Sequence, residues 1–255
     1  MTDKTEGHSR KHPEEYFGEH IGIVACSAEG AALCYRTICA EGPALMGAHA
    51  HPEVTMHTYP LSRYMEYIYR DDWQGVAELM VSSAELVAKT GATFAICPDN
   101  TIHQVFDYVE KHSVIPWLHI AREVAAVASA KEFSKLGVLG TRYLMEGPVY
   151  VKALEQRGIK REIPDEEQRL RINQIIFDEL VYGKFEDSSR KYFSDVIISL
   201  KDRGCDAVVL GCTEIPLLIA PENSVLPILD STRILARAAL AKATSTAVGC
   251  SQTHS

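Results

Sequence analysis

Short apolar runs recur along the chain, and most of them end in small or polar residues. They are too short for typical helices and are rich in branched side chains, a pattern typical of strands that are buried on both faces of a parallel sheet. The predicted strands are 21–26, 53–58, 92–97, 135–140 and 206–211.

Longer segments with helical spacing separate these runs. Residues 73–89 place Val76, Leu79, Met80 and Val87 on one stripe, and 193–203 and 234–242 show the same kind of spacing. Strands that alternate with helices favour a parallel α/β architecture.

The chain also repeats its own pattern. The segment GATFAICPDNTIH, which begins at Gly91, aligns without a gap with GCDAVVLGCTEIP, which begins at Gly204. Downstream, VIPWLHIAR (114–122) resembles VLPILDSTR (225–233), and upstream IGIVACS (21–27) resembles LGVLGTR (136–142). Matches in the same order indicate a duplicated α/β unit, although two unrelated strand–helix units can also look alike.

The duplication has a consequence for function. It pairs Asp99 with Cys212, and both residues follow predicted strands. Ligands of parallel sheets bind beyond the carboxyl ends of the strands. The sequence therefore predicts an α/β fold of two pseudo-symmetric domains. Each is a short parallel sheet flanked by helices, and the active site lies in the cleft between them, with Asp99 and Cys212 on its two sides.

The expected domain boundaries follow from this pattern. Residues 20–118 plus 228–243 form the first domain, and residues 119–227 form the second. The polar residues 1–19 are expected to be a mobile leader, and the small, polar residues 244–255 a flexible tail.

Composition narrows the functional classes. The 255 residues are 46% hydrophobic and 24% charged, which is typical of a globular protein, and the formal net charge is -8. No basic stripe occurs, so a nucleic-acid partner is not expected. No apolar run approaches the roughly 18 residues of a membrane span, and the N-terminus has no apolar signal core. The expected location is therefore the cytoplasm.

Seven cysteines are present, an odd number that predicts no disulfide framework in a chain of this length. There is no CxxC pair, and the histidines of HAHPEVTMH (49–57) have no settled ligand spacing, so no metal site is expected. Most of the cysteines are interpreted as small buried hydrophobes.

Several motifs together resemble the aspartate/glutamate racemase superfamily over residues 21–242. The most specific are LGCTEIPLL (210–218) and PILDST (227–232). PDNTIH (98–103) resembles the other signature, in which a cysteine precedes Asn-Thr-x-His. Supporting motifs are HPEV (51–54), DDW (71–73), IPWLHI (115–120) and EEQ (166–168).

The resemblance implies a reaction without a cofactor, in which two thiols on opposite faces of an amino acid remove and return the α-proton. Either group must serve as the base, and the ordinary thiol pKa of about 8.5 lies within tuning range of neutrality. Cys212 matches the second family cysteine, whereas Asp99 stands where the first is expected. Cys97 is interpreted as a core thiol. We therefore expect asymmetric proton transfer between Cys212 and Asp99; the alternative is that Asp99 only binds substrate or orients Asn100.

The resemblance also implies the groups that bind substrate. Arg63 and Arg169 occupy places where the family carries cationic ligands for substrate carboxylates, and a guanidinium can hold a carboxylate through two hydrogen bonds. Polar residues at the strand-end turns can hold a carboxylate and stabilise enolate-like charge, although Thr and Asn also occupy such turns for local reasons. They are Asn100, Thr101, Thr141 and Thr213. Glu214 is expected to orient Cys212 or the substrate ammonium, and His103 either polarises the first loop or caps a helix.

These observations predict a racemase or epimerase of an acidic amino acid, and the resemblance implies a homodimer. A one-thiol decarboxylase, cis–trans isomerase or lyase of a small carboxylic acid is the first alternative, because Asp99 replaces a thiol. A non-catalytic protein that binds small carboxylates is the second. Two departures leave the identity of the substrate open, namely Asp99 itself and the altered loop ACSAEG (25–30).

Overall fold

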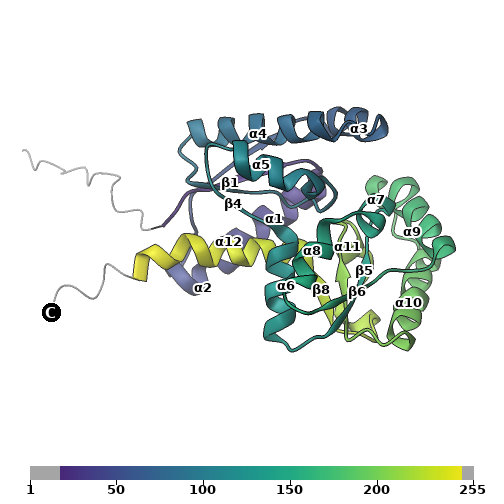
Figure 1. Cartoon of the computed structure of the whole chain (residues 1–255). Coiled ribbons are helices and arrows are strands. Elements are labelled where there is room, and N and C mark those ends of the chain that lie inside the picture. Colours follow the sequence, from purple (N-terminus) through teal and green to yellow (C-terminus); the bar gives the residue numbers. More distant parts are fainter. Residues whose placement is uncertain (1–17, 249–255) are drawn as a thin grey trace, which may run out of the picture.

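The computed structural model describes residues 18–248 and contains two parallel four-stranded sheets flanked by helices (Figure 1). The expected α/β fold of two similar halves is confirmed. The strand orders are β2-β1-β3-β4 and β6-β5-β7-β8, so the second sheet repeats the topology of the first. The predicted leader, residues 1–19, lies almost wholly outside the described residues.

The first sheet and its helices come from the N-terminal half of the chain. Its strands are β1 (Ile21–Ala25), β2 (Val54–Thr58), β3 (Phe94–Ile96) and β4 (Trp117–Leu118). Its helices are α1 (Ala28–Glu41), α2 (Pro43–Met46), α3 (Leu61–Tyr69), α4 (Trp73–Lys89), the 3₁₀ helix η2 (Thr101–Val105) and α5 (Phe106–His112).

The second sheet follows in the same order. Its strands are β5 (Lys135–Leu139), β6 (Lys160–Glu162), β7 (Ala207–Leu210) and β8 (Ile228–Asp230). The helices from the C-terminal part of the chain are α6 (Ile120–Ala130), α7 (Arg142–Glu146), α8 (Val149–Glu155), α9 (Glu166–Asp178), η3 (Leu180–Tyr182), α10 (Asp187–Asp202), α11 (Ile215–Leu218), η4 (Pro221–Asn223) and α12 (Ser231–Val248).

The central strands are apolar because they are buried on both faces. Every residue of β1, β3 and β7 is buried, because helices cover both faces of each sheet. The two repeated segments also begin alike: Gly91 and Gly204 have φ angles of 104° and 82°, a conformation that glycine adopts without steric cost. Each glycine ends a helix and turns the chain into a central strand, which supports the duplicated unit.

Each half is completed by a helix that follows the last strand of the other sheet. Leu235, Ala236 and Ala239 of α12 pack into the core of the first sheet, beside Ile23 and Phe94. Figure 1 shows α12 running along the first half next to α1. Helix α6 packs in turn against the second sheet and α8. This exchange fixes the two strand-end surfaces relative to each other.

Two details of the expected boundaries need correction. Strand β8 pairs with β7 and so belongs to the second sheet, although the predicted first domain included residues from 228 onward. Residues 244–248, expected in a flexible tail, continue α12, because its apolar face remains packed as far as Ala243; residues 249–255 lie outside the described residues. The other boundaries stay predictions.

Candidate active site

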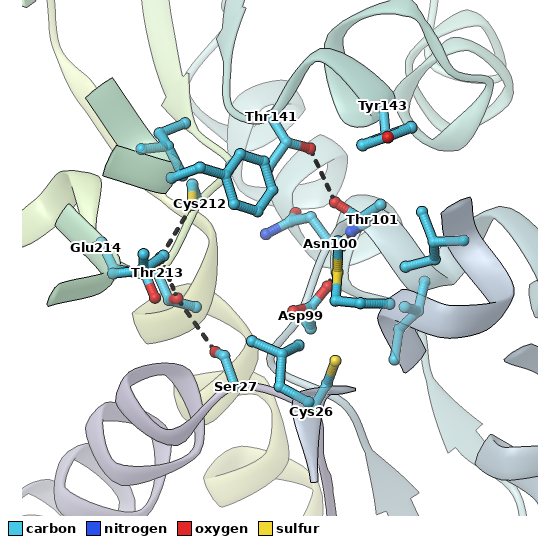
Figure 2. Close-up of a pocket in the computed structure, with 18 residues that line it drawn as sticks. Cys26, Ser27, Asp99, Asn100, Thr101, Thr141, Tyr143, Cys212, Thr213 and Glu214 are labelled. Carbon is cyan, nitrogen blue, oxygen red and sulfur yellow. Dashed lines mark hydrogen bonds between the residues drawn. The ribbon is translucent and has the colours of Figure 1, made fainter. Parts of the chain in front are cut away.

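A pocket lies where the carboxyl ends of the two sheets face each other (Figure 2). Its free space, including the mouth, is about 650 Å³, which is the size of a small-molecule site. Of the predicted site residues it gathers Asp99, Asn100, Thr101, Thr141, Cys212, Thr213 and Glu214. The loops after β3 and β7 therefore meet as the duplication predicts.

Asp99 is held at the start of the turn after β3. Its Oδ1 accepts a hydrogen bond from the Thr101 backbone N–H at 3.1 Å, and the thiol of Cys26 lines the pocket beside it. Burial and the nearby negative charge of Glu214 raise the pKa of Asp99 to about 6. The carboxylate is therefore still mostly ionised at neutral pH but more basic than an ordinary aspartate.

Cys212 lies on the other side of the pocket, next to Glu214 (Figure 2). Its Sγ donates a hydrogen bond to Glu214 Oε2 at 2.9 Å, and the Thr213 hydroxyl donates to the same oxygen at 2.8 Å. Burial and the negative charge of Glu214 raise the pKa of the Cys212 thiol well above its ordinary value. The thiol is consequently protonated at neutral pH.

Hydroxyl groups from both halves join across the pocket. Thr101 Oγ1 and Thr141 Oγ1 lie 3.1 Å apart, and Ser27 Oγ and Thr213 Oγ1 lie 3.3 Å apart. Thr141 also caps α7 by accepting a hydrogen bond from the Leu144 backbone N–H. These four hydroxyls can hold a small carboxylate and the charge that develops on it.

Asn100 connects the two halves through its side chain. Its Nδ2 donates to Ser231 Oγ at 2.9 Å, and its Oδ1 accepts from the Tyr150 hydroxyl at 2.7 Å. The Ser231 hydroxyl in turn donates a hydrogen bond to the carbonyl of Leu210 at 2.9 Å. Because these bonds are buried, Asn100 fixes the loop of Asp99 against the second half.

His103 supports the same loop from behind. Its Nδ1 donates to the carbonyl of Asp99 at 2.7 Å, and its Nε2 accepts from the Ile120 backbone N–H at 3.4 Å. Burial and the nearby His119 lower the pKa of His103 well below its ordinary value, so the ring is neutral. It holds the backbone of Asp99 and does not line the pocket.

The two arginines expected to bind carboxylates do not reach the pocket. Arg63 is exposed on α3 and lies over the ring of Tyr59, with 4.5 Å between its Cζ and the ring centroid. Arg169 donates from Nε to Glu146 Oε1 at 3.0 Å and from Nη1 to the carbonyl of Pro164 at 2.8 Å. Arg169 therefore ties α9 to α7, and Arg63 faces solvent.

Cys26 is a site residue that the sequence reasoning missed. It directly follows β1 in the altered loop ACSAEG, is 4% exposed, and lines the pocket with Asp99. Two thiol–carboxylate pairs thus face each other, Cys26 with Asp99 and Cys212 with Glu214. The signal was the position of a cysteine at the end of a central strand, equivalent to the strand before Thr141.

The rest of the lining was not predicted either; it includes Tyr143 of α7 and is otherwise mostly apolar. Helix α3 supplies Leu61, Met65 and Ile68, and α9 supplies Ile176 and Phe177. Among the described residues, 18–248, no group of three or more His, Cys, Asp or Glu is arranged to hold a metal ion. Within the same part of the chain, no helix is long and apolar enough to cross a membrane.

Comparisons with known proteins support the fold and identify a family. The family model for Asp/Glu/Hydantoin racemase matches residues 22–239. A crystal structure from Yersinia pestis, assigned as an Asp/Glu racemase, is 31% identical and covers 87% of this chain and 97% of its own, with a TM-score of 0.81. An aspartate racemase homologue from Pyrococcus horikoshii OT3 is 25% identical, covers 87% of this chain and 97% of its own, and has a TM-score of 0.76.

A further relative has a named activity. The broad specificity amino-acid racemase RacX of Bacillus subtilis (strain 168) is 22% identical over 191 residues, which cover 73% of this chain and 80% of the relative. The match of the family model extends over both sheets and includes the loops of Asp99 and Cys212. The chain belongs to the Asp/Glu/Hydantoin racemase family.

Proposed function

We propose that this protein is an amino-acid racemase that moves the α-proton with its own side chains, Asp99 on one face of the substrate and Cys212 on the other. The observation that carries the proposal is the placement of a carboxylate and a thiol on equivalent strand-end loops at one pocket. Two acid/base groups on opposite faces are what inversion at a carbon by proton transfer requires.

The protonation of the two groups assigns their roles. With its pKa raised to about 6, Asp99 is mostly a carboxylate at neutral pH, and Cys212 is a thiol because its pKa is raised as well. Asp99 takes the α-proton from the substrate, and the Cys212 thiol gives its proton to the opposite face. The thiolate and the protonated Asp99 that result return to the starting state by proton exchange with solvent.

The intermediate carries negative charge on the substrate carboxylate. Hydroxyl groups of Ser27, Thr101, Thr141 and Thr213 line the pocket and can donate to these oxygens. Glu214 accepts hydrogen bonds from Cys212 and Thr213 and so orients both. It also disfavours the thiolate, which keeps Cys212 ready to act as the acid.

The acidic substrate expected from the sequence depended on Arg63 and Arg169. Because neither arginine lines the pocket, our proposal keeps racemisation of an amino acid and does not retain an aspartate- or glutamate-like side chain. The relatives named above support racemisation as the reaction class.

The test is an incubation of the purified protein with single enantiomers in heavy water, with chirality and α-deuterium both measured. We expect the opposite enantiomer to appear with deuterium at its α-carbon. Cys212→Ser and Asp99→Asn should each lose racemisation by at least about 100-fold. Cys39→Ser, a change of the same kind on α1 outside the pocket, should not. Absence of both exchange and inversion across all amino acids tried would refute the proposal.

One observation favours a second candidate function. Only one of the two facing groups is a thiol, an arrangement that also suits loss of carbon dioxide from a malonate-type acid followed by protonation from Cys212. Carbon dioxide release that depends on Cys212 but not on an α-hydrogen in the substrate would support this alternative over racemisation.

A further inference from the structure

The pocket has an apolar side that the proton transfer does not use. Leu61, Met65 and Ile68 of α3 line the pocket together with Ile176 and Phe177 of α9 and Val181 of η3. They come from both halves of the chain and share the pocket with the polar residues of the strand-end loops. Figure 2 shows unlabelled apolar side chains surrounding Asp99, Thr101 and Cys212. A substrate with its α-carbon between Asp99 and Cys212 would place its side chain against this surface.

No positively charged side chain of residues 18–248 lines the same space. None of the 18 residues that line the pocket in the described part of the chain is Lys or Arg. The charged groups there are Asp99 and Glu214, and the negative charge of Glu214 already raises the pKa of Asp99. A substrate with a second carboxylate would add negative charge beside them and leave that carboxylate unpaired against apolar side chains, which is costly.

The two arginines that could have offset the negative charge of the pocket make their contacts outside it. Arg169 is 18% exposed in its side chain and bonds to Glu146 and the carbonyl of Pro164. Arg63 lies on the exposed side of α3, and its neighbours on the pocket side of that helix are Leu61 and Met65. A dicarboxylate would have to break the contacts of Arg169 or draw Arg63 around the helix.

We propose that the substrate is a neutral amino acid with an apolar side chain, seated against Met65, Ile176 and Phe177, rather than aspartate or glutamate. This inference rests on the racemase function proposed above and specifies its substrate. The zwitterion carries no net charge, so it adds none to a pocket that already holds two carboxylates. Burial of each methylene on the apolar side strengthens binding by about fourfold.

The experiment measures α-deuterium exchange and inversion for L-leucine, L-methionine, L-phenylalanine, L-aspartate and L-glutamate with the full-length protein. We expect kcat/KM for at least one apolar amino acid to exceed that for aspartate and glutamate by about 10- to 100-fold. Arg63→Ala should leave all values within about twofold, because its side chain lies outside the pocket.

A gain of charge tests the apolar side directly. Met65→Arg places a cation in the lining, and it should reduce turnover of the apolar substrates and shift the preference toward aspartate or glutamate by at least about tenfold. Ser62→Arg adds the same charge to an exposed position of the same helix and should leave the preference unchanged. Circular dichroism and thermal unfolding verify that both variants fold.

The outcomes separate the two proposals. Turnover of aspartate or glutamate above every apolar amino acid would overturn the inference about the substrate and leave the racemase function intact. A large loss of that turnover in Arg63→Ala would identify Arg63 as the missing ligand. Exchange with none of the amino acids would overturn the racemase function itself, and the substrate inference with it.

Discussion

Replacement of Asp99 by asparagine should stabilise the protein while it abolishes racemisation. Asparagine has nearly the same shape, keeps an oxygen for the Thr101 backbone N–H, and cannot ionise. The change therefore removes one property of the site, the negative charge that burial and Glu214 make costly. Its effect on stability and its effect on catalysis have the same physical origin.

The size of the stability effect follows from the pKa. A carboxyl whose pKa rises from 3.8 in the unfolded chain to about 6 in the fold makes the folded protein about 3 kcal/mol less stable at neutral pH than an unshifted group would. Between these two pKa values the folded state binds the proton more tightly than the unfolded state. The contribution of protonated Asp99 to stability is thus fully present below pH 3.8 and is lost as the pH rises through about 6.

Urea unfolding of wild type and Asp99→Asn over a range of pH measures this difference. The variant lacks this pH-dependent loss of stability. Its free energy of unfolding should therefore rise relative to that of wild type by about 2 kcal/mol between about pH 4.5 and about pH 7.5. Asp206→Asn is a control of opposite sign, because hydrogen bonds from the Ser134 hydroxyl and backbone hold the pKa of Asp206 below its ordinary value. That variant should therefore lose ground to wild type only as the pH rises toward the ordinary value of 3.8, and the difference between the two should stay constant from about pH 4.5 to about pH 7.5.

The stereochemistry of exchange completes this prediction. Without Asp99, a Cys212 thiolate can still remove and return a proton on its own face. Asp99→Asn should therefore exchange the α-hydrogen of one enantiomer slowly, with retained configuration, and produce no inversion. Parallel stability curves for wild type and variant would refute the raised pKa, and undiminished inversion would refute Asp99 as one of the two bases.

Three further changes test the surroundings of the site. Glu214→Gln removes the charge that raises the pKa of Asp99, so the acidic limb of the kcat/KM profile, expected near pH 6 in the wild type, should move to lower pH. Cys26→Ala removes the thiol that lowers the pKa of Asp99, so the acidic limb should move to higher pH, whereas Cys26→Ser should stay near wild type. If the limb moved in neither Cys26→Ala nor Glu214→Gln, it would not report the titration of Asp99. Tyr150→Phe leaves the buried Oδ1 of Asn100 without its 2.7 Å bond and should lower stability by about 1–3 kcal/mol in thermal or urea unfolding, while an unchanged unfolding free energy would contradict that role for the bond.

The architecture could be predicted because burial leaves a clear mark on the sequence. All five strands expected from apolar runs are present, within two residues at each end, and the helix expected at 73–89 has those bounds. The strands that were missed are short or polar. Strand β6 reads Lys-Arg-Glu, lies at the edge of its sheet, and has no buried residue, so hydrophobicity could not identify it.

Some residues of the site could be predicted from the sequence and others could not. Asp99 and Cys212 were predictable because they follow central strands, and the duplication places the ends of those strands opposite each other. The positions of Arg63 and Arg169 depend on which side of a helix faces the pocket, and a family resemblance does not fix that. The apolar side of the pocket was missed because Met65 and Phe177 have ordinary helical spacing, which indicates core and ligand contact equally well. Dimerisation stays a prediction.

The asymmetry of the pair does not make the reaction one-way. Two enantiomers have equal free energy in water, so kcat/KM must be equal in the two directions for any racemase, whatever its bases are. The state that acts on the second enantiomer, protonated Asp99 with a Cys212 thiolate, is rare because Glu214 disfavours the thiolate. The same destabilisation makes that thiolate a stronger base, and the two effects offset each other. The replacement of a thiol by Asp99 must therefore appear in kcat and KM separately and in their dependence on pH, while the equilibrium between the enantiomers is unaffected.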